Sequence, residues 1–170
     1  MTETMTLYKL IILYLLQKVD FALNTSQLAE FILDKGYTTY FALQKALSEL
    51  LEDGFLSAES THQHTFYRLT QSGEQTIEYF RSRLSPAIKQ DVKDFLKEKE
   101  YALREEASVK SKYYKNTEQE YDVICQILED GVNLMELKLT VPTQSEAESI
   151  ADNWPKYNQE IYSLLMSKLL

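Results

Sequence analysis

The residues best suited to chemistry stand at the start of a predicted helix in the first third of the chain. Hydroxyl and ammonium groups can bind phosphates, a Gln amide can read the edge of adenine, and Thr can contact base edges or a thymine methyl group. The candidates are Thr38, Thr39, Tyr40, Gln44 and Lys45, with Arg68 of a predicted strand as a sixth. This set indicates contact with double-stranded DNA, although the same residue types also fit any polar surface.

Other reactive side chains lack the neighbours that a catalytic or metal site needs. His62 and His64 have a spacing compatible with a metal, but no third ligand stands near them in the sequence, and two ligands do not make a site. Cys125 falls in a predicted strand, which favours a small buried side chain over an activated thiol. With four glycines, the chain carries no phosphate-cradling loop. We therefore predict no enzyme activity, no cofactor and no metal.

Three predicted helices position the candidate residues. Residues 5–19 indicate a first helix that is apolar on nearly every side, so we expect it to be covered on more than one side. The sequence Asn24–Gln27 is typical of a capping box at the start of a second helix, which ends near Gly36. A third helix is predicted from Thr38 or Thr39 to about Asp53, with a buried stripe of leucine and alanine.

A hairpin and a fourth helix follow the third helix. Phe55–Glu59 and His64–Leu69 predict two short strands joined by a polar turn, and Thr70 or Ser72 caps the next helix. Two short helices followed by a hairpin are typical of a winged helix-turn-helix, whose third helix enters the major groove. In a dimer, two such helices must lie about 34 Å apart to use one face of the duplex. Arg68 and the polar hairpin turn could then contact the DNA backbone or minor groove.

The second half of the chain changes from helical to alternating periodicity. Ser85–Pro86 starts a long helix whose charge run, Lys97–Glu100, we interpret as a solvated face. After residue 108, three strands are predicted, with an Asp-Gly hairpin turn between the last two. A capping box at Thr143–Glu146 begins the final helix, and Pro155 should kink or split that helix.

These elements predict an α+β fold in three parts. Residues 1–84 form a winged helix-turn-helix domain, and residues 85–107 form a long connecting helix. Residues 108–170 form a small α+β domain, in which a three-stranded antiparallel sheet carries the C-terminal helix. A domain of about sixty residues is small for an independent core, which favours burial against a partner.

Several stretches of the sequence resemble known families. The segment Tyr67–Gly73 resembles the wing-to-helix junction of PadR-like and MarR-like bacterial regulators. Nearly the whole chain is similar to an uncharacterised bacterial family, domain of unknown function 4364. The stretches that carry this similarity are Leu10–Tyr14, Val19–Phe21, Gly36–Phe41 and Leu137–Pro142. The resemblance implies a winged-helix fold and a regulatory role, but this family has no established activity to transfer. PadR-like proteins have a helical second domain, so their mode of dimerisation is not implied here.

Composition and charge limit the function. The 170 residues carry a formal net charge of -8, which excludes a uniformly basic nucleic-acid coat. Residues 1–80 hold five basic and ten acidic side chains, so their net charge of -5 opposes phosphate binding. A single Cys fits a reducing compartment, and the apolar run Leu10–Leu16 is too short to span a bilayer. We expect a cytoplasmic protein without membrane contact.

Two functions remain open from the sequence. The first is a DNA-binding transcriptional regulator that acts as a homodimer. The second is a winged-helix module that binds another protein without contacting DNA, which the acidic balance and the twelve tyrosines would suit. A small-molecule effector could bind the second half, but the sequence identifies none.

Overall fold

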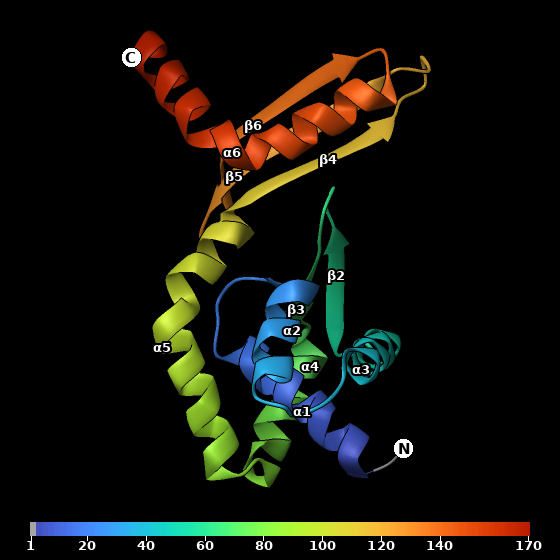
Figure 1. The fold of residues 1–170 in the computed structure, drawn as a ribbon, viewed down its shortest axis with the longest axis vertical. Coiled ribbons are helices and arrows are strands. Elements are labelled where there is room, and N and C mark those ends of the chain that lie inside the picture. Colours follow the sequence, from blue (N-terminus) through green and yellow to red (C-terminus); the bar gives the residue numbers. More distant parts are fainter. Residues whose placement is uncertain (1–2) are drawn as a thin grey trace. The chain divides into compact units, whose positions relative to one another are not determined.

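The computed structural model describes residues 3–170 and divides into two compact units (Figure 1). The first unit comprises the chain up to Glu59 and His64–Leu103, and the second comprises Ser60–Gln63 and Arg104–Leu170. Within the described residues, six α-helices and two three-stranded antiparallel sheets form a mixed α+β fold. The predicted α+β class is therefore confirmed.

The first unit is built mainly from helices around one small sheet. Its helices are α1 (Glu3–Gln17), α2 (Thr25–Asp34), α3 (Tyr40–Glu52), α4 (Gln71–Phe80), a 3₁₀ turn (Arg81–Arg83) and α5 (Pro86–Ser108), whose last residues, from Arg104 on, belong to the second unit. Its strands are β1 (Leu23–Asn24), β2 (Leu56–Ser60) and β3 (Thr65–Leu69), in the order β1-β3-β2. The sequence predicted all of these except β1 and the 3₁₀ turn. A two-residue strand is too short to show a periodicity.

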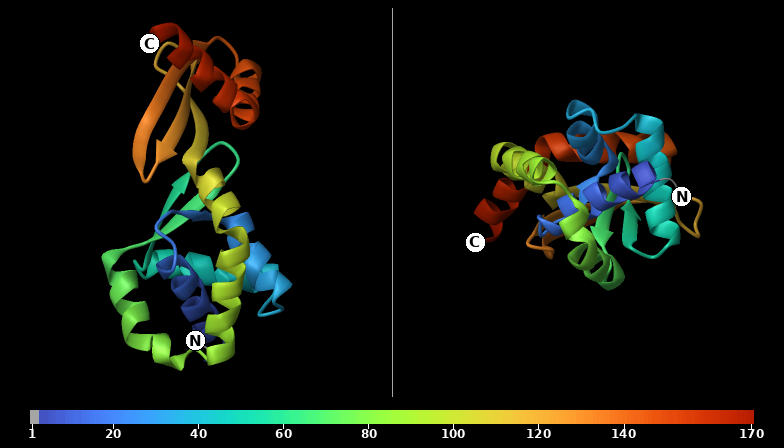
Figure 2. Two further views of the ribbon diagram at one scale, coloured as in Figure 1. Left: turned by 90° about the vertical axis from the view of Figure 1, so that its left-hand side faces the viewer. Right: turned by 90° about the horizontal axis from the view of Figure 1, so that it is seen from below.

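Helix α1 forms the centre of the first unit, as its all-round apolar sequence predicted. Every residue from Lys9 to Leu16 is buried, and Figure 2 shows α1 running between α4 and α5. Lys9 is the one charged residue in this buried stretch, and its Nζ lies 2.6 Å from Glu49 Oε2 of α3. This ion pair satisfies a charge that would otherwise be costly to bury.

Local hydrogen bonds define where the helices of the first unit begin. The Asn24 side chain accepts from the Gln27 N–H, and the Gln27 side chain accepts from the Asn24 N–H, both at 2.9 Å, so the predicted capping box is confirmed. Thr70 caps α4 by accepting from the Gly73 N–H at 3.1 Å. Gly73 also approaches another backbone closely, because a Cβ at this position would lie 2.0 Å from the Phe55 carbonyl oxygen.

The second unit is a three-stranded sheet with one long helix. Strands β4 (Val109–Lys115), β5 (Tyr121–Glu129) and β6 (Val132–Val141) are ordered β4-β5-β6. Asp130 and Gly131 join β5 to β6 with φ values of 49° and 78°, which is the backbone that an Asp-Gly turn favours. Helix α6 (Gln144–Leu169) starts at the predicted Thr143 capping box and covers one face of the sheet.

The core of the second unit lies between α6 and the covered face of the sheet. Its buried members are Val123, Cys125, Ile127, Ala147, Ala151 and Trp154. The indole N–H of Trp154 donates to the Gln126 carbonyl at 3.1 Å, so this large side chain is buried with its polar group satisfied.

Pro155 does not split α6, which continues through it to Leu169; Figure 1 shows the helix changing direction along its length. Proline has no N–H to donate to the carbonyl four residues earlier, which belongs to Ala151. The Ser111 hydroxyl of β4 donates to that carbonyl instead, at 2.9 Å. The Asn158 amide further donates to the Trp154 and Pro155 carbonyls. Side chains thus replace the hydrogen bond that proline removes.

Candidate nucleic-acid interface

Helix α3 is held by one apolar face, which leaves its opposite face exposed. Leu43, Ala46, Leu47 and Leu50 are buried, as the sequence predicted, and α3 packs against α1 and α2. Tyr40, Phe41, Lys45 and Ser48 are exposed on the other side. An amphipathic helix of this kind presents its polar face without weakening the core.

The predicted threonines lie at the amino-terminal end of α3. Thr39 is the N-cap, and its hydroxyl accepts from the Ala42 N–H at 3.3 Å. Its side chain therefore already has a structural role, although the residue stays exposed. Thr38 is half-buried just before it.

Tyr40, Gln44 and Lys45 come together on the first turns of α3. The Gln44 amide donates to the Tyr40 hydroxyl at 2.8 Å, which orients the amide along the helix surface. Tyr40 is 54% exposed and Lys45 is exposed. Phe41, which the sequence analysis did not include, is 80% exposed beside them. The sequence could have identified Phe41 as a contact residue, because it lies opposite the apolar stripe and a Phe on the polar face of an amphipathic helix is unusual.

Arg68 belongs to a different element, strand β3. It is exposed, whereas the preceding Phe66 and Tyr67 are buried. No hydrogen bond or ion pair joins Arg68 to α3 within residues 3–170. The structure therefore brings five of the six candidates together and leaves Arg68 on β3.

The charges of α3 are separated along its length. Residues 38–48 contain Lys45 and no carboxylate, whereas Glu49, Glu52 and Asp53 follow at the other end. The hydrogen bond from Lys9 holds the pKa of Glu49 below its ordinary value, so Glu49 stays ionised and is paired. The exposed start of α3 is thus the least acidic part of this helix.

Helix α5 anchors the loop that precedes α3. The Tyr37 hydroxyl donates to Asp91 of α5, and Lys35 Nζ lies 3.8 Å from the same carboxylate. Burial and then this hydrogen bond raise the pKa of Tyr37 far above its ordinary value, so the phenol remains the donor. The chain therefore enters α3 from a fixed position.

The hairpin turn between β2 and β3 already has partners, which the sequence did not indicate. Its residues Ser60–Gln63 belong to the second unit, where His62 Nε2 and Gln63 Nε2 each lie 2.8 Å from Asp152 Oδ1. The hydrogen bonds from Gln63 and then His62 lower the pKa of Asp152. Two polar side chains of the turn that the sequence offered for DNA contact, His62 and Gln63, are therefore bonded to a carboxylate.

The remaining reactive groups do not form a site. Among residues 3–170, no cluster of three or more His, Cys, Asp or Glu could hold a metal ion. Cys125 is buried as predicted, and burial raises the pKa of its thiol to about 11. The thiol is thus protonated at neutral pH and unsuited to nucleophilic attack.

Comparison with known proteins places the chain in one family. Residues 8–169 match the family model described as a domain of unknown function, DUF4364. No curated protein matches the chain. In the described part of the chain, no helix combines the length and the apolar character needed to cross a membrane.

Proposed function

The chain belongs to the DUF4364 family, and we propose that it is a winged helix-turn-helix protein that binds duplex DNA as a homodimer and regulates transcription. The order α1-β1-α2-α3-β2-β3-α4 supports this proposal, because it is the order of elements in a winged helix. In that arrangement α3 is the recognition helix and the β2–β3 hairpin is the wing.

The exposed start of α3 carries the proposal. It presents two aromatic rings, an oriented amide and an ammonium group, and residues 38–48 hold no carboxylate that would repel phosphates. Gln44 would read a base edge, while Lys45 and the Tyr40 hydroxyl would bind the backbone. The acidic excess of the first eighty residues then lies outside this helix start.

Charge reversal at Lys45 and Arg68 tests the DNA contact. Duplexes are first selected from a random pool, and their affinity is then measured by fluorescence anisotropy across a salt series. We expect the variant Lys45→Glu/Arg68→Glu to bind at least about tenfold more weakly, with a salt slope shallower by about 0.9 for each phosphate that the protein no longer neutralises. Both side chains are exposed, so the fold should persist.

A matched variant, Lys112→Glu/Lys156→Glu, makes the same charge change at exposed positions of the second unit. We expect it to bind the selected duplexes much as the unaltered protein does. An equal loss of affinity in both variants would show that net charge alone matters, and an unaffected Lys45→Glu/Arg68→Glu variant would reject α3 and β3 as the contact surface.

The half of α6 that follows Pro155 supports the homodimer. Tyr157 and Leu164 are 49% and 58% exposed, and between Tyr157 and Leu169 the only charged residues are Glu160 and Lys168. Leu164 lies midway between these two charges. An antiparallel pair of α6 helices crossing at Leu164 would therefore bury the apolar side chains and place each Glu160 against Lys168 of a second copy. Ile161 and Tyr162 connect this face to the core of the unit.

Light scattering tests this dimer. Leu164→Glu should give a monomer at micromolar concentration, whereas Gln159→Glu, on the opposite side of the same helix, should leave the dimer intact. Glu160→Lys should weaken the dimer, because it places two ammonium groups against each other. The double variant Glu160→Lys/Lys168→Glu should restore the dimer, because the charges again have opposite signs. A dimer that resists Leu164→Glu would contradict the α6 pairing.

The exposed Phe41 favours a second candidate function, a winged helix that binds another protein. An apolar ring that is 80% exposed beside Tyr40 suits a protein interface, and so does the acidic balance of the unit. No retention on duplex DNA at low salt, together with a stable complex that Phe41→Ser abolishes, would favour this candidate over DNA binding.

A further inference from the structure

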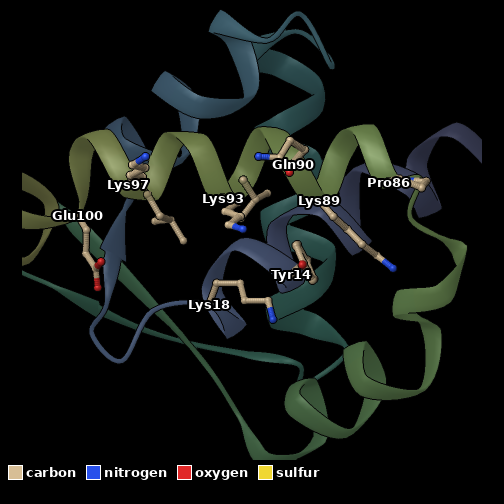
Figure 3. A pocket seen from close by; sticks show the side chains of 10 residues that line it. Tyr14, Lys18, Pro86, Lys89, Gln90, Lys93, Lys97 and Glu100 are labelled. Atoms are coloured by element: carbon tan, nitrogen blue, oxygen red, sulfur yellow. The ribbon is translucent and has the colours of Figure 1, made fainter.

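A hollow in the first unit lies between the carboxyl-terminal half of α1 and the amino-terminal half of α5 (Figure 3). Its volume is about 610 Å³, within the range of pockets that hold small molecules. Tyr14, Val92 and Leu96 supply its apolar wall, and all three are buried. The wall is therefore held in place by the core, and the aliphatic stems of the lysines that also line the hollow add carbon surface that a ligand can reach.

Lysines surround this apolar wall. The pocket is lined by Lys18, Lys89, Lys93 and Lys97, against one carboxylate, Glu100. Figure 3 shows Lys93 reaching from α5 toward Tyr14 and Lys18. The three lysines of α5 stand four residues apart, so they share one face of the helix and repel one another.

These lysines differ from others in the same unit. Lys9, Lys35 and Lys99 each pair with a carboxylate of another helix. By contrast, within residues 3–170 no ion pair involves any of the four pocket lysines. Lys18 instead lies over the Tyr14 ring, 5.1 Å from its centroid. A cleft lined by one sign of charge raises the local concentration of the opposite ion.

We propose that this pocket binds a small amphipathic carboxylate. Its apolar body would pack on the lysine stems over Tyr14 and Leu96, and its carboxylate would lie between the ammonium groups of Lys18 and Lys93. The apolar wall and the surrounding lysines together favour amphipathic carboxylates. A free inorganic anion would leave the apolar wall uncovered, and a neutral lipid would leave the lysine ammonium groups without a counter-charge.

The pocket is connected to both ends of α3 through α1 and α5. Lys9 of α1 pairs with Glu49 of α3, and Asp91 of α5 accepts from Tyr37 just before α3. A ligand that changes the spacing of α1 and α5 would act on both anchors. The ligand would thereby change the affinity of α3 for DNA. This effect depends on the proposed DNA-binding function, whereas binding of the ligand to the pocket does not.

Calorimetric titration of the full chain with decanoate, below its micelle concentration, tests the site. We expect one decanoate per chain, with decanol and decyltrimethylammonium binding at least about tenfold more weakly. Inorganic phosphate should bind no better than decanol. Failure of decanoate to bind, or equal binding of the three decyl compounds, would overturn the proposal.

Variants then locate the carboxylate. Lys18→Gln/Lys93→Gln should weaken decanoate binding at least about tenfold, whereas the matched surface variant Lys112→Gln/Lys156→Gln should not. Circular dichroism checks that both variants fold. Unchanged decanoate affinity in Lys18→Gln/Lys93→Gln would overturn the site.

Duplex affinity measured with and without decanoate separates the two proposals. Decanoate binding accompanied by a changed duplex affinity supports both. If decanoate binds and no duplex binds, the pocket stands and the DNA-binding function fails. If decanoate binds without changing the duplex affinity, the pocket stands and its coupling to α3 is wrong.

Discussion

The first unit buries its most apolar segment completely, whereas the second leaves large apolar side chains exposed. Seven consecutive residues of α1, Leu10 to Leu16, are buried inside the first unit. In the second unit the buried core cluster has six members, and Leu134, Leu139, Leu164, Met166 and Leu169 are at least 39% exposed. The difference indicates different roles for their surfaces.

The surfaces of the two units follow from their cores. The first unit buries its aliphatic segment, and the large apolar side chains that it exposes are mostly aromatic, such as Phe41 and Tyr79; hydroxyls and an amide on α3 and lysines around the pocket accompany them. The second unit leaves several large aliphatic side chains outside its core and exposed, which favours association with a second copy. The first unit therefore suits charged ligands and the second suits self-assembly.

The two units also hold their backbones together differently. In the first unit the backbones at Gly73 and Phe55 approach closely, whereas in the second unit side chains reach the Ala151 carbonyl and the Asp122 carboxylate. Substitutions at these points test the contrast in order of expected effect.

Gly73→Ala should give the largest effect, in the first unit. An alanine would gain about 1 kcal/mol of helix propensity over glycine in α4. Its Cβ would lie 2.0 Å from the Phe55 carbonyl oxygen, and the backbone shift this forces should cost more, about 3 kcal/mol net or above. Chemical denaturation measures the difference, with Ser72→Ala on the neighbouring exposed turn as the control. A more stable Gly73→Ala variant would show that α4 can move away from the Phe55 carbonyl without cost.

Ser111→Ala should give a smaller but clear loss of stability in the second unit. It removes the donor to the Ala151 carbonyl, which Pro155 already deprives of its helical partner. A buried carbonyl left without a partner costs about 1–3 kcal/mol. Ser149→Ala removes a similar serine-to-carbonyl bond at an exposed position of α6 and should change the stability little. Equal losses of stability in Ser111→Ala and Ser149→Ala would mean that water can bond to the Ala151 carbonyl when the Ser111 hydroxyl is removed.

Acid should weaken the second unit through Asp122, with a smaller effect again. Hydrogen bonds from Thr140 at 2.7 Å and Asn116 at 3.1 Å, and then the Lys138 ammonium, lower the pKa of Asp122 below its ordinary value. A lowered pKa stabilises the folded state above the unfolded pKa, about pH 4, and this contribution is lost as the pH falls through the folded pKa.

The pH dependence of Asp122→Asn checks this effect. The variant should be less stable than the unaltered protein at neutral pH, and the difference should narrow below about pH 4. Asp130→Asn, at an exposed turn position, is the control and should show no such narrowing. A constant difference from neutral to acidic pH would contradict the role assigned to the Asp122 charge.

Local signals in the sequence were sufficient to predict most of the elements. The capping boxes at Asn24 and Thr143 and the Asp130–Gly131 turn act over four residues or fewer, so the sequence specifies them directly. The stripe of buried leucines fixed which side of α3 is exposed, and with it the place of Tyr40, Gln44 and Lys45. Hydrogen bonding and burial periodicity within one segment need no knowledge of the rest of the chain.

Only the tertiary structure decided which distant segments meet. Lys97 and Glu100 are exposed, as the interpretation of the charge run predicted, but the sequence did not indicate that they line a pocket with Tyr14, more than eighty positions earlier. Nothing in the sequence indicates that Ser111 bonds to Ala151 or that Gly73 approaches Phe55. Such contacts depend on how whole elements pack, and that packing is set by the summed burial of many side chains rather than by any local pattern.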